Sequence, residues 1–107
     1  MTTFDKREEG FEKQFAHDEE LKFRAEARRD KLLGLWVAEK LGLSGDAAKD
    51  YAKAVVAADF EEAGDADMVR KVMGDLAAKA VAMTEAQIRA KMDELMVQAI
   101  VQVKAGT

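Results

Sequence analysis

From residue 18 onward, apolar residues recur at intervals of three and four along almost the whole chain, and no proline interrupts the pattern. Positions with that spacing fall on one face of an α-helix. Alanine, the strongest helix former, is abundant, and the alternation typical of strands is hard to find. The 107 residues are expected to form a single domain. We therefore predict an all-α fold.

Four helices are predicted from the apolar spacing and from residues that start and stop helices. Gly42 is placed to end the first helix, and Asp65 is placed to cap the third. Thr84 and Gln87 have the spacing of a capping box at the start of the fourth. Gly74 lies inside the third helix, where we expect it to allow a close helix crossing. Short connections favour antiparallel neighbours in a four-helix bundle. The predicted helices cover residues 18–41, 46–62, 66–81 and 84 to nearly the end of the chain.

The first predicted helix is charged in its first half and apolar in its second. Leu33, Trp36 and Val37 share one face, so we expect the second half to be buried and the first half to stay mostly in water. In the second helix, an apolar stripe runs through Val55 to Phe60. These faces are expected to supply the core of the bundle.

The amino-terminal segment has a different character. Seventeen of the first 31 residues are charged, yet Phe4, Phe11 and Phe15 have the spacing of one helical face. Three anchors are too few to hold a helix in water, because nucleation is costly and Gly10 opposes it by up to about 1 kcal/mol. We predict a flexible N-terminal arm, residues 1–17, that folds on docking to a partner and precedes a helical bundle of residues 18–107. A simply disordered terminus is the alternative.

Charge and composition exclude several classes of partner. The net charge of −4 provides no excess of basic residues to neutralise phosphates, so we expect no nucleic-acid partner. No apolar stretch approaches the roughly 20 residues that span a bilayer, so we expect no direct membrane insertion. The absence of cysteine excludes disulfides and thiolate zinc sites and suits a reducing cytoplasm. We therefore expect a soluble, cytoplasmic protein.

The inventory of reactive side chains does not favour an enzyme. His17 is the only histidine, and without cysteine neither Ser-His-Asp nor Cys-His catalysis is expected. We expect no metal site and no cofactor. His17 lies where the arm meets the bundle, and imidazole titrates near neutral pH, so it is a candidate pH sensor. An exposed histidine without such a role is the alternative.

Three basic residues of the first predicted helix are candidate ligand contacts. Arg28, Arg29 and Lys31 could bind the phosphates of ATP or ADP weakly, although the chain has no phosphate-binding glycine motif. The alternative is that they form an ordinary solvated face.

Three sequence runs carry a resemblance to a known family. They are FDKREEGFE at residues 4–12, FAHDEEL at 15–21 and ARRDKLLGLW at 27–36. This pattern resembles the zeta-type inhibitor subunit of the F-type ATP synthase of alphaproteobacteria. The resemblance is densest over residues 3–43 and looser along the rest of the chain.

The resemblance implies a four-helix bundle carrying a mobile inhibitory arm. In that family the arm is thought to enter the catalytic α/β interface of the ATPase head, near the central stalk, and to block rotation in the hydrolytic direction. The implied partners are the α, β and central-stalk subunits of the head, which places the protein in the cytoplasm, peripherally associated with the inner membrane through the ATP synthase. Gly10 departs from the alanine expected at its position. Carried over to this chain, the partner-binding residues are Phe4, Asp5, Lys6, Arg7, Glu8, Phe11, Glu12 and Phe15.

Two functions follow from these observations. The first is a protein inhibitor of ATP hydrolysis that acts through the arm. The alternative is a helical bundle that binds adenine nucleotides and acts as a regulatory sensor.

Overall fold

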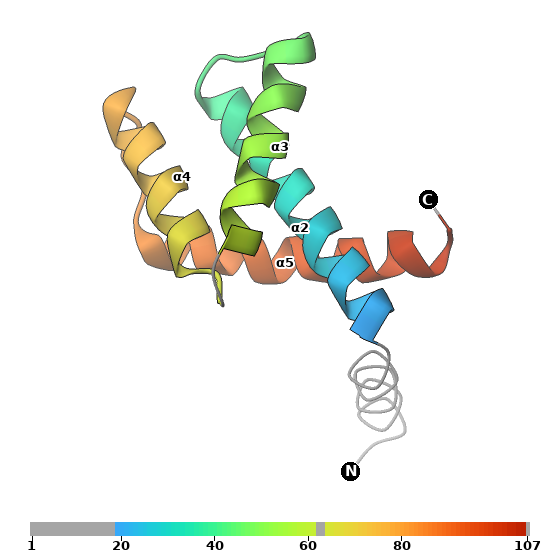
Figure 1. Ribbon diagram of the computed structural model, residues 1–107. Helices are drawn as coiled ribbons and strands as arrows, with labels where there is room; N and C mark the ends of the chain where they lie inside the picture. The colour runs from blue at the N-terminus through green and yellow to red at the C-terminus, as the bar shows by residue number, and fades with distance from the viewer. Residues whose placement is uncertain (1–18, 62–63, 107) are drawn as a thin grey trace.

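The computed structural model describes residues 19–61 and 64–106, and these ranges form four helices without a strand. The helices are α2 (Glu19–Lys40), α3 (Gly45–Glu61), α4 (Ala66–Ala78) and α5 (Glu85–Lys104), as Figure 1 shows. The prediction of an all-α, four-helix fold is confirmed. The predicted bounds lie close to those observed, except that α4 ends at Ala78 rather than near residue 81.

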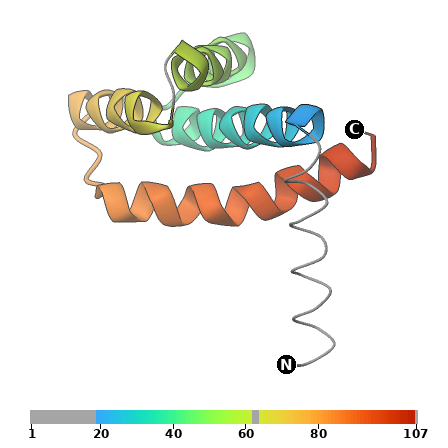
Figure 2. The same ribbon diagram turned by 60° about the horizontal axis from the view of Figure 1, so that its bottom comes forward.

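Helix α2 is the centre of the bundle. It packs most extensively against α3 on one side and against α5 on the other, whereas α4 packs mainly against α3. Figure 2 shows α5 as a layer of its own beside α2 and α4, with α3 on the opposite side of α2. The amino-terminal end of α2 and the carboxyl-terminal end of α5 lie at the same end of the molecule. The core side chains are Leu33, Val37, Val55, Met68, Val69, Val72, Leu76, Ile88, Met92 and Leu95.

The close crossing of α2 and α3 depends on Gly34. A Cβ added at Gly34 would lie 2.6 Å from the Cα of Ala52 and 3.3 Å from the Cβ of Val55, so only glycine fits this contact. The expectation that Gly74 provides a close crossing is wrong, because a Cβ built there meets no atom within 4 Å. The glycine that matters for packing is therefore in the first helix of the bundle, not in α4.

The helix starts agree only in part with the expected capping. The capping box of α5 is confirmed: Thr84 Oγ1 accepts from the Gln87 backbone N–H at 3.1 Å, and the Thr84 N–H donates to Gln87 Oε1 at 2.9 Å. Asp65 occupies the N-cap position of α4, but its side chain makes no capping hydrogen bond. Arg89 of α5 donates to the Asp65 carboxylate at 3.2 Å, which draws that group away from the helix end.

Helices α2 and α4 both end in the same type of turn, but a different residue occupies the left-handed position in each. In α2, the Leu43 N–H donates to the Ala38 carbonyl, and Gly42 has a φ of 79°, which glycine adopts without steric cost. In α4, the Val81 N–H donates to the Leu76 carbonyl, and Ala80 takes the left-handed position with a φ of 57°. Helix α4 therefore stops early in a turn that disfavours alanine.

Two side-chain placements differ from the expected faces. Ala25 and Asp30, in the first half of α2, are buried, so that half contributes to the core more than its charge suggests. Phe60 does not join the core; it is 37% exposed and stacks on Phe23 with ring centroids 4.5 Å apart. Asp59 is the buried residue at the end of α3 instead.

Alanine at the two helical glycines is expected to change stability in opposite directions. Gly34→Ala should lower the free energy of unfolding by about 1–2 kcal/mol, because overpacking strain exceeds the gain in helix propensity. Gly74→Ala should raise it by about 0.5–1 kcal/mol, because the position is open and alanine favours the helix. Urea unfolding followed by circular dichroism measures both. Equal effects of the two substitutions would contradict the assignment of the crossing to Gly34.

Candidate functional site

The expected partner-binding residues of the N-terminal arm lie outside the described residues, as does His17. Their roles stay predictions. The arm residues concerned are Phe4, Asp5, Lys6, Arg7, Glu8, Phe11, Glu12 and Phe15. Within the described ranges, a candidate site is found between α2, α3 and the end of α5.

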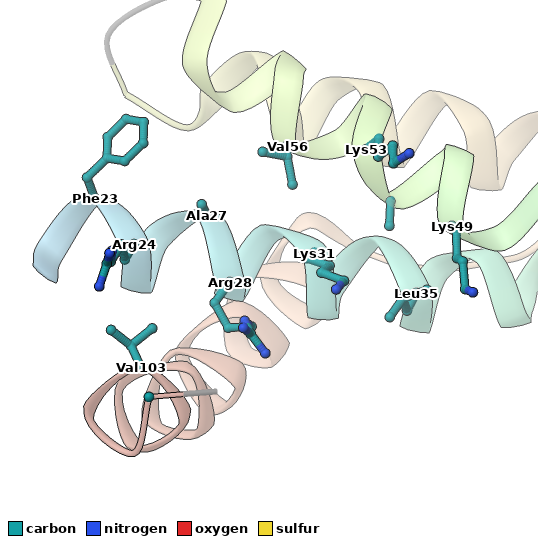
Figure 3. Close-up of a pocket in the computed structure, with 12 residues that line it drawn as sticks. Phe23, Arg24, Ala27, Arg28, Lys31, Leu35, Lys49, Lys53, Val56 and Val103 are labelled. Atoms are coloured by element: carbon teal, nitrogen blue, oxygen red, sulfur yellow. The ribbon is translucent and has the colours of Figure 1, made fainter. Parts of the chain in front are cut away.

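This site is a cavity of about 870 Å³, here called the basic groove. Figure 3 shows its side chains arranged along α2, with α3 on one side and Val103 of α5 on the other. It begins at Phe23, one turn after the start of α2, and follows that helix to Leu35. The lining residues are Phe23, Arg24, Ala27, Arg28, Lys31, Leu35, Lys49, Ala52, Lys53, Val56, Val103 and Gly106.

The lining combines cations with apolar side chains and contains no carboxylate. Arg24 pairs with Glu20 at 3.5 Å on the exposed start of α2, and Arg28 donates to Gln102 Oε1 at 3.1 Å. In residues 19–61 and 64–106, no carboxylate lies within ion-pair distance of Lys31, Lys49 or Lys53. A concave surface of this kind suits an anionic ligand that also has an apolar part.

The structure brings together two of the three basic residues expected to contact a phosphate. Arg28 and Lys31 line the basic groove, whereas Arg29 does not. Lys49 and Lys53 were missed because they come from α3, a helix that carried no predicted site. Their spacing of four residues places them on one helical face, and this is the signal that could have found them.

Arg29 belongs to a second cluster, which joins α2 to α3. Its Nη2 lies 3.0 Å from Asp30 Oδ1 and 3.4 Å from Asp59 Oδ2, so one guanidinium bridges two carboxylates. Asp30 is fully buried and Asp59 is 7% exposed. Asp30 Oδ2 is buried and accepts no hydrogen bond from the part of the chain that the structure describes.

Burial raises the pKa of Asp30 to about 8, and the neighbouring Asp59 carboxyl adds to the rise through a side-chain hydrogen bond and its charge. The positive charge of Arg29 lowers the pKa but does not overcome the desolvation. A buried carboxyl with this pKa holds its proton at pH 7. The α2–α3 contact therefore contains a neutral carboxylic acid beside one ion pair.

Sequence reasoning missed both aspartates, although each lies in phase with a buried face. Asp59 follows Ala52 and Val55 at helical intervals, and Asp30 precedes Leu33 and Val37 in the same way. Polar residues are usually assigned to the solvated face of a helix, so the sequence alone did not lead to a prediction that these two aspartates are buried. The helical register is the signal that identifies them.

The described ranges contain neither a metal-binding cluster nor a membrane-spanning helix. No group of three or more histidine, cysteine, aspartate or glutamate side chains there could hold a metal ion. None of the four helices has a stretch long and apolar enough to cross a membrane.

Comparisons with known proteins relate the chain to a family. The family model described as ATPase inhibitor subunit zeta matches residues 1–102, which include the N-terminal arm and every groove residue except Val103 and Gly106. A solved solution NMR structure shares 55% sequence identity with the chain and has a TM-score of 0.71. That match covers 81% of this chain and 99% of the other. The curated proteins contain no match.

Asp30→Asn is expected to stabilise the protein at alkaline pH. The pKa of Asp30 rises from 3.8 to about 8 on folding, so the stability it contributes is fully present below pH 4 and is lost as pH rises towards 8. Asparagine keeps the shape but has no proton to lose. Since one unit of pKa is worth about 1.4 kcal/mol, we expect a gain of at least about 1 kcal/mol at pH 8.

Urea unfolding at pH 5, 7 and 9 measures this effect. Asp93→Asn is a control that removes one carboxylate from the exposed surface of α5. Parallel pH profiles for the parent chain and Asp30→Asn would show that Asp30 is already ionised in the folded protein.

Proposed function

Because the chain belongs to the ATPase inhibitor subunit zeta family, we propose that it inhibits ATP hydrolysis by the F-type ATP synthase through its N-terminal arm. The arm inserts as an induced helix at the catalytic α/β interface, near the central stalk, and blocks hydrolytic rotation. The observation that supports this proposal is the extent of the family match, which begins at residue 1 and so includes the whole arm. The protein then works in the cytoplasm, held at the inner membrane through the ATP synthase.

The chemistry of the arm suits such a docking reaction. Phe4, Phe11 and Phe15 fall on one helical face, and each stabilises the complex by about 1.5–3 kcal/mol when fully desolvated, before ordering costs are subtracted. The charged residues around them set the register and orientation of the bound helix through charge complementarity. These are Asp5, Lys6, Arg7, Glu8 and Glu12.

The bundle gives the bound arm a continuous support. Helix α2 starts at Glu19, directly after the arm, and its first turn is exposed and acidic, as the helix macrodipole favours. An induced helix in the arm therefore extends α2 into a single rod. The rest of the bundle stops the arm from threading through its partner.

Removal of the arm tests the proposal. Deleting residues 2–17 should abolish inhibition of the isolated catalytic head, while the helicity and melting of the bundle stay unchanged. Phe11→Ala should raise the inhibitory concentration by about tenfold or more, since the lost burial exceeds about 1.4 kcal/mol. ATPase assays across a concentration series measure both.

Glu9→Ala is the matched control, because it truncates a polar side chain of the same segment on the side of the helix opposite the phenylalanine face. It should inhibit as strongly as the parent chain. Full inhibition by the protein without residues 2–17 would end this proposal.

A second function, sensing of adenine nucleotides, is favoured by the basic groove. Lys31, Lys49 and Lys53 supply cations for phosphates, and Phe23 and Val56 supply apolar surface for a base. The two functions are compatible, since an inhibitor that also binds ATP or ADP would respond to the energy state of the cell.

Titration of ATP and ADP tests the sensor. Amide shifts should saturate and concentrate on the groove residues of α2 and α3. Lys49→Glu with Lys53→Glu should weaken binding by about tenfold or more, because two favourable charge interactions become repulsive. The control pair Lys22→Glu with Lys79→Glu makes the same change in net charge outside the groove and should leave affinity unchanged. Shifts scattered over the whole surface would exclude a nucleotide site.

A further inference from the structure

The outer face of helix α5 carries two exposed valines on successive turns. Val97 and Val101 are 65% and 60% exposed, although valine is among the residues most often buried. Figure 2 shows α5 as a layer of its own at the edge of the molecule. Adjacent exposed apolar side chains on such a layer favour contact with another molecule. The opposite face of α5 is buried and consists of Ile88, Met92, Leu95 and Ala99.

Charged residues of opposite sign flank the two valines on the outer face. Glu94 precedes Val97 by three residues, and Lys104 follows Val101 by three. All four side chains are exposed, and their intervals of three, four and three residues are those of a coiled-coil seam. Asp93 adds a second negative charge at the Glu94 end. The outer face is therefore acidic at one end, apolar in the middle and basic at the other.

This order of charges is complementary to itself when the helix is reversed. Residue 99 is the midpoint between Val97 and Val101, and it is also the midpoint between Glu94 and Lys104. In an antiparallel pair of α5 helices centred there, Val97 lies opposite the second copy's Val101. Glu94 then lies opposite the second copy's Lys104, and like charges are separated by about 15 Å, more than the screening length of about 10 Å. A parallel pair would place like charges side by side, so the face fits only the antiparallel arrangement.

We propose that two copies of the chain associate through the outer face of α5, as an antiparallel helix pair with a two-fold axis near Ala99. Four valines form the apolar centre of this seam, and each Glu94 pairs with the other copy's Lys104. Lys91 contacts Glu94 at Oε1, 3.2 Å away, and the carboxylate has a second oxygen for the new pair. The association uses no residue of the basic groove, and it does not depend on the proposed inhibition of ATP hydrolysis.

The seam is short, so the dimer is weak and reversible. Stable dimers bury about 1,600 Å² in total, whereas transient contacts bury less than about 1,200 Å². Two valines and two charged side chains from each copy belong to the transient class. We therefore expect a dissociation constant of roughly 0.1–1 mM, with the monomer dominant in dilute solution.

Sedimentation equilibrium of the full chain tests the association. Between about 20 µM and about 2 mM, the weight-average mass should rise by about half, as the expected dissociation constant requires. Val97→Ser with Val101→Ser should keep the monomer mass throughout, and the circular dichroism of the parent chain should be retained because both side chains are exposed. A parent chain that stays monomeric to the highest concentration would overturn the proposal, as would a serine variant that associates like the parent.

Charge exchange tests the pairing. Glu94→Lys or Lys104→Glu alone should raise the dissociation constant by about tenfold or more, because each substitution acts twice in a two-fold interface. Both together exchange the charges and should return the constant to within about threefold of the parent value. Failure of the double variant to recover would overturn the pairing.

Matched controls make the same charge changes elsewhere. Glu39→Lys in α2 matches Glu94→Lys, and Lys79→Glu at the end of α4 matches Lys104→Glu. Both side chains are exposed and lie outside α5. The controls should leave the dissociation constant unchanged. An effect as large as that of the α5 substitutions would show that net charge alone governs association, and would overturn the proposal.

A spin label identifies the helix and its direction. The chain contains no cysteine, so Ala90→Cys creates a unique site for a nitroxide on the outer face of α5. The spin-labelled chain is mixed with an isotope-labelled parent chain. Antiparallel pairing should broaden the parent's amide signals near Lys104 most strongly. Broadening strongest near residue 90 would overturn the antiparallel arrangement, and broadening strongest in α2 or α3 would overturn α5 as the interface.

Discussion

The close approach of α2 and α3 at Gly34 is the constraint on which the remaining geometry depends. The absence of a side chain there lets the Ala52 backbone lie against α2, and both helices then keep their neighbouring residues in contact along the crossing. One consequence is the cluster of Arg29, Asp30 and Asp59, which needs the two helices near each other. A second consequence is the basic groove, which is lined by Ala52 and by lysines from both helices.

The polar cluster at this crossing is an unusual component of so small a core. A fully buried carboxyl with one oxygen that accepts no hydrogen bond opposes folding unless it stays protonated, and burial keeps it so. Arg29 donates a hydrogen bond to the other oxygen. Apolar side chains in the same positions would pack without this requirement, so we infer that the cluster orients the helices relative to each other more than it strengthens their contact.

Features that depend on local sequence could be predicted, and those that depend on contacts between helices could not. The capping box at Thr84 and the stop at Gly42 involve residues within one turn, and both are present. The close crossing was predicted at Gly74 but lies at Gly34, because the need for a small residue is set by the helix that crosses it. Asp65 has the right position for a cap, but Arg89 of α5 takes its carboxylate. For the groove, Arg28 and Lys31 of α2 were predicted from the sequence, whereas Lys49 and Lys53 acquire their role only when α3 packs beside α2.

Helix α4 differs from the other elements in how firmly it is held. It has an open glycine at its centre, an alanine in the left-handed turn at its end and no side-chain cap at its start. Its attachment includes four buried apolar residues, a hydrogen bond of 2.7 Å from the Tyr51 hydroxyl to Asp75, and the ammonium group of Lys71 over the Tyr51 ring. We therefore expect local opening to require less free energy in α4 than in α2, with the amide hydrogens of α4 exchanging with solvent first. No residue of α4 lines the basic groove, so local opening of α4 leaves the lining of the groove unchanged.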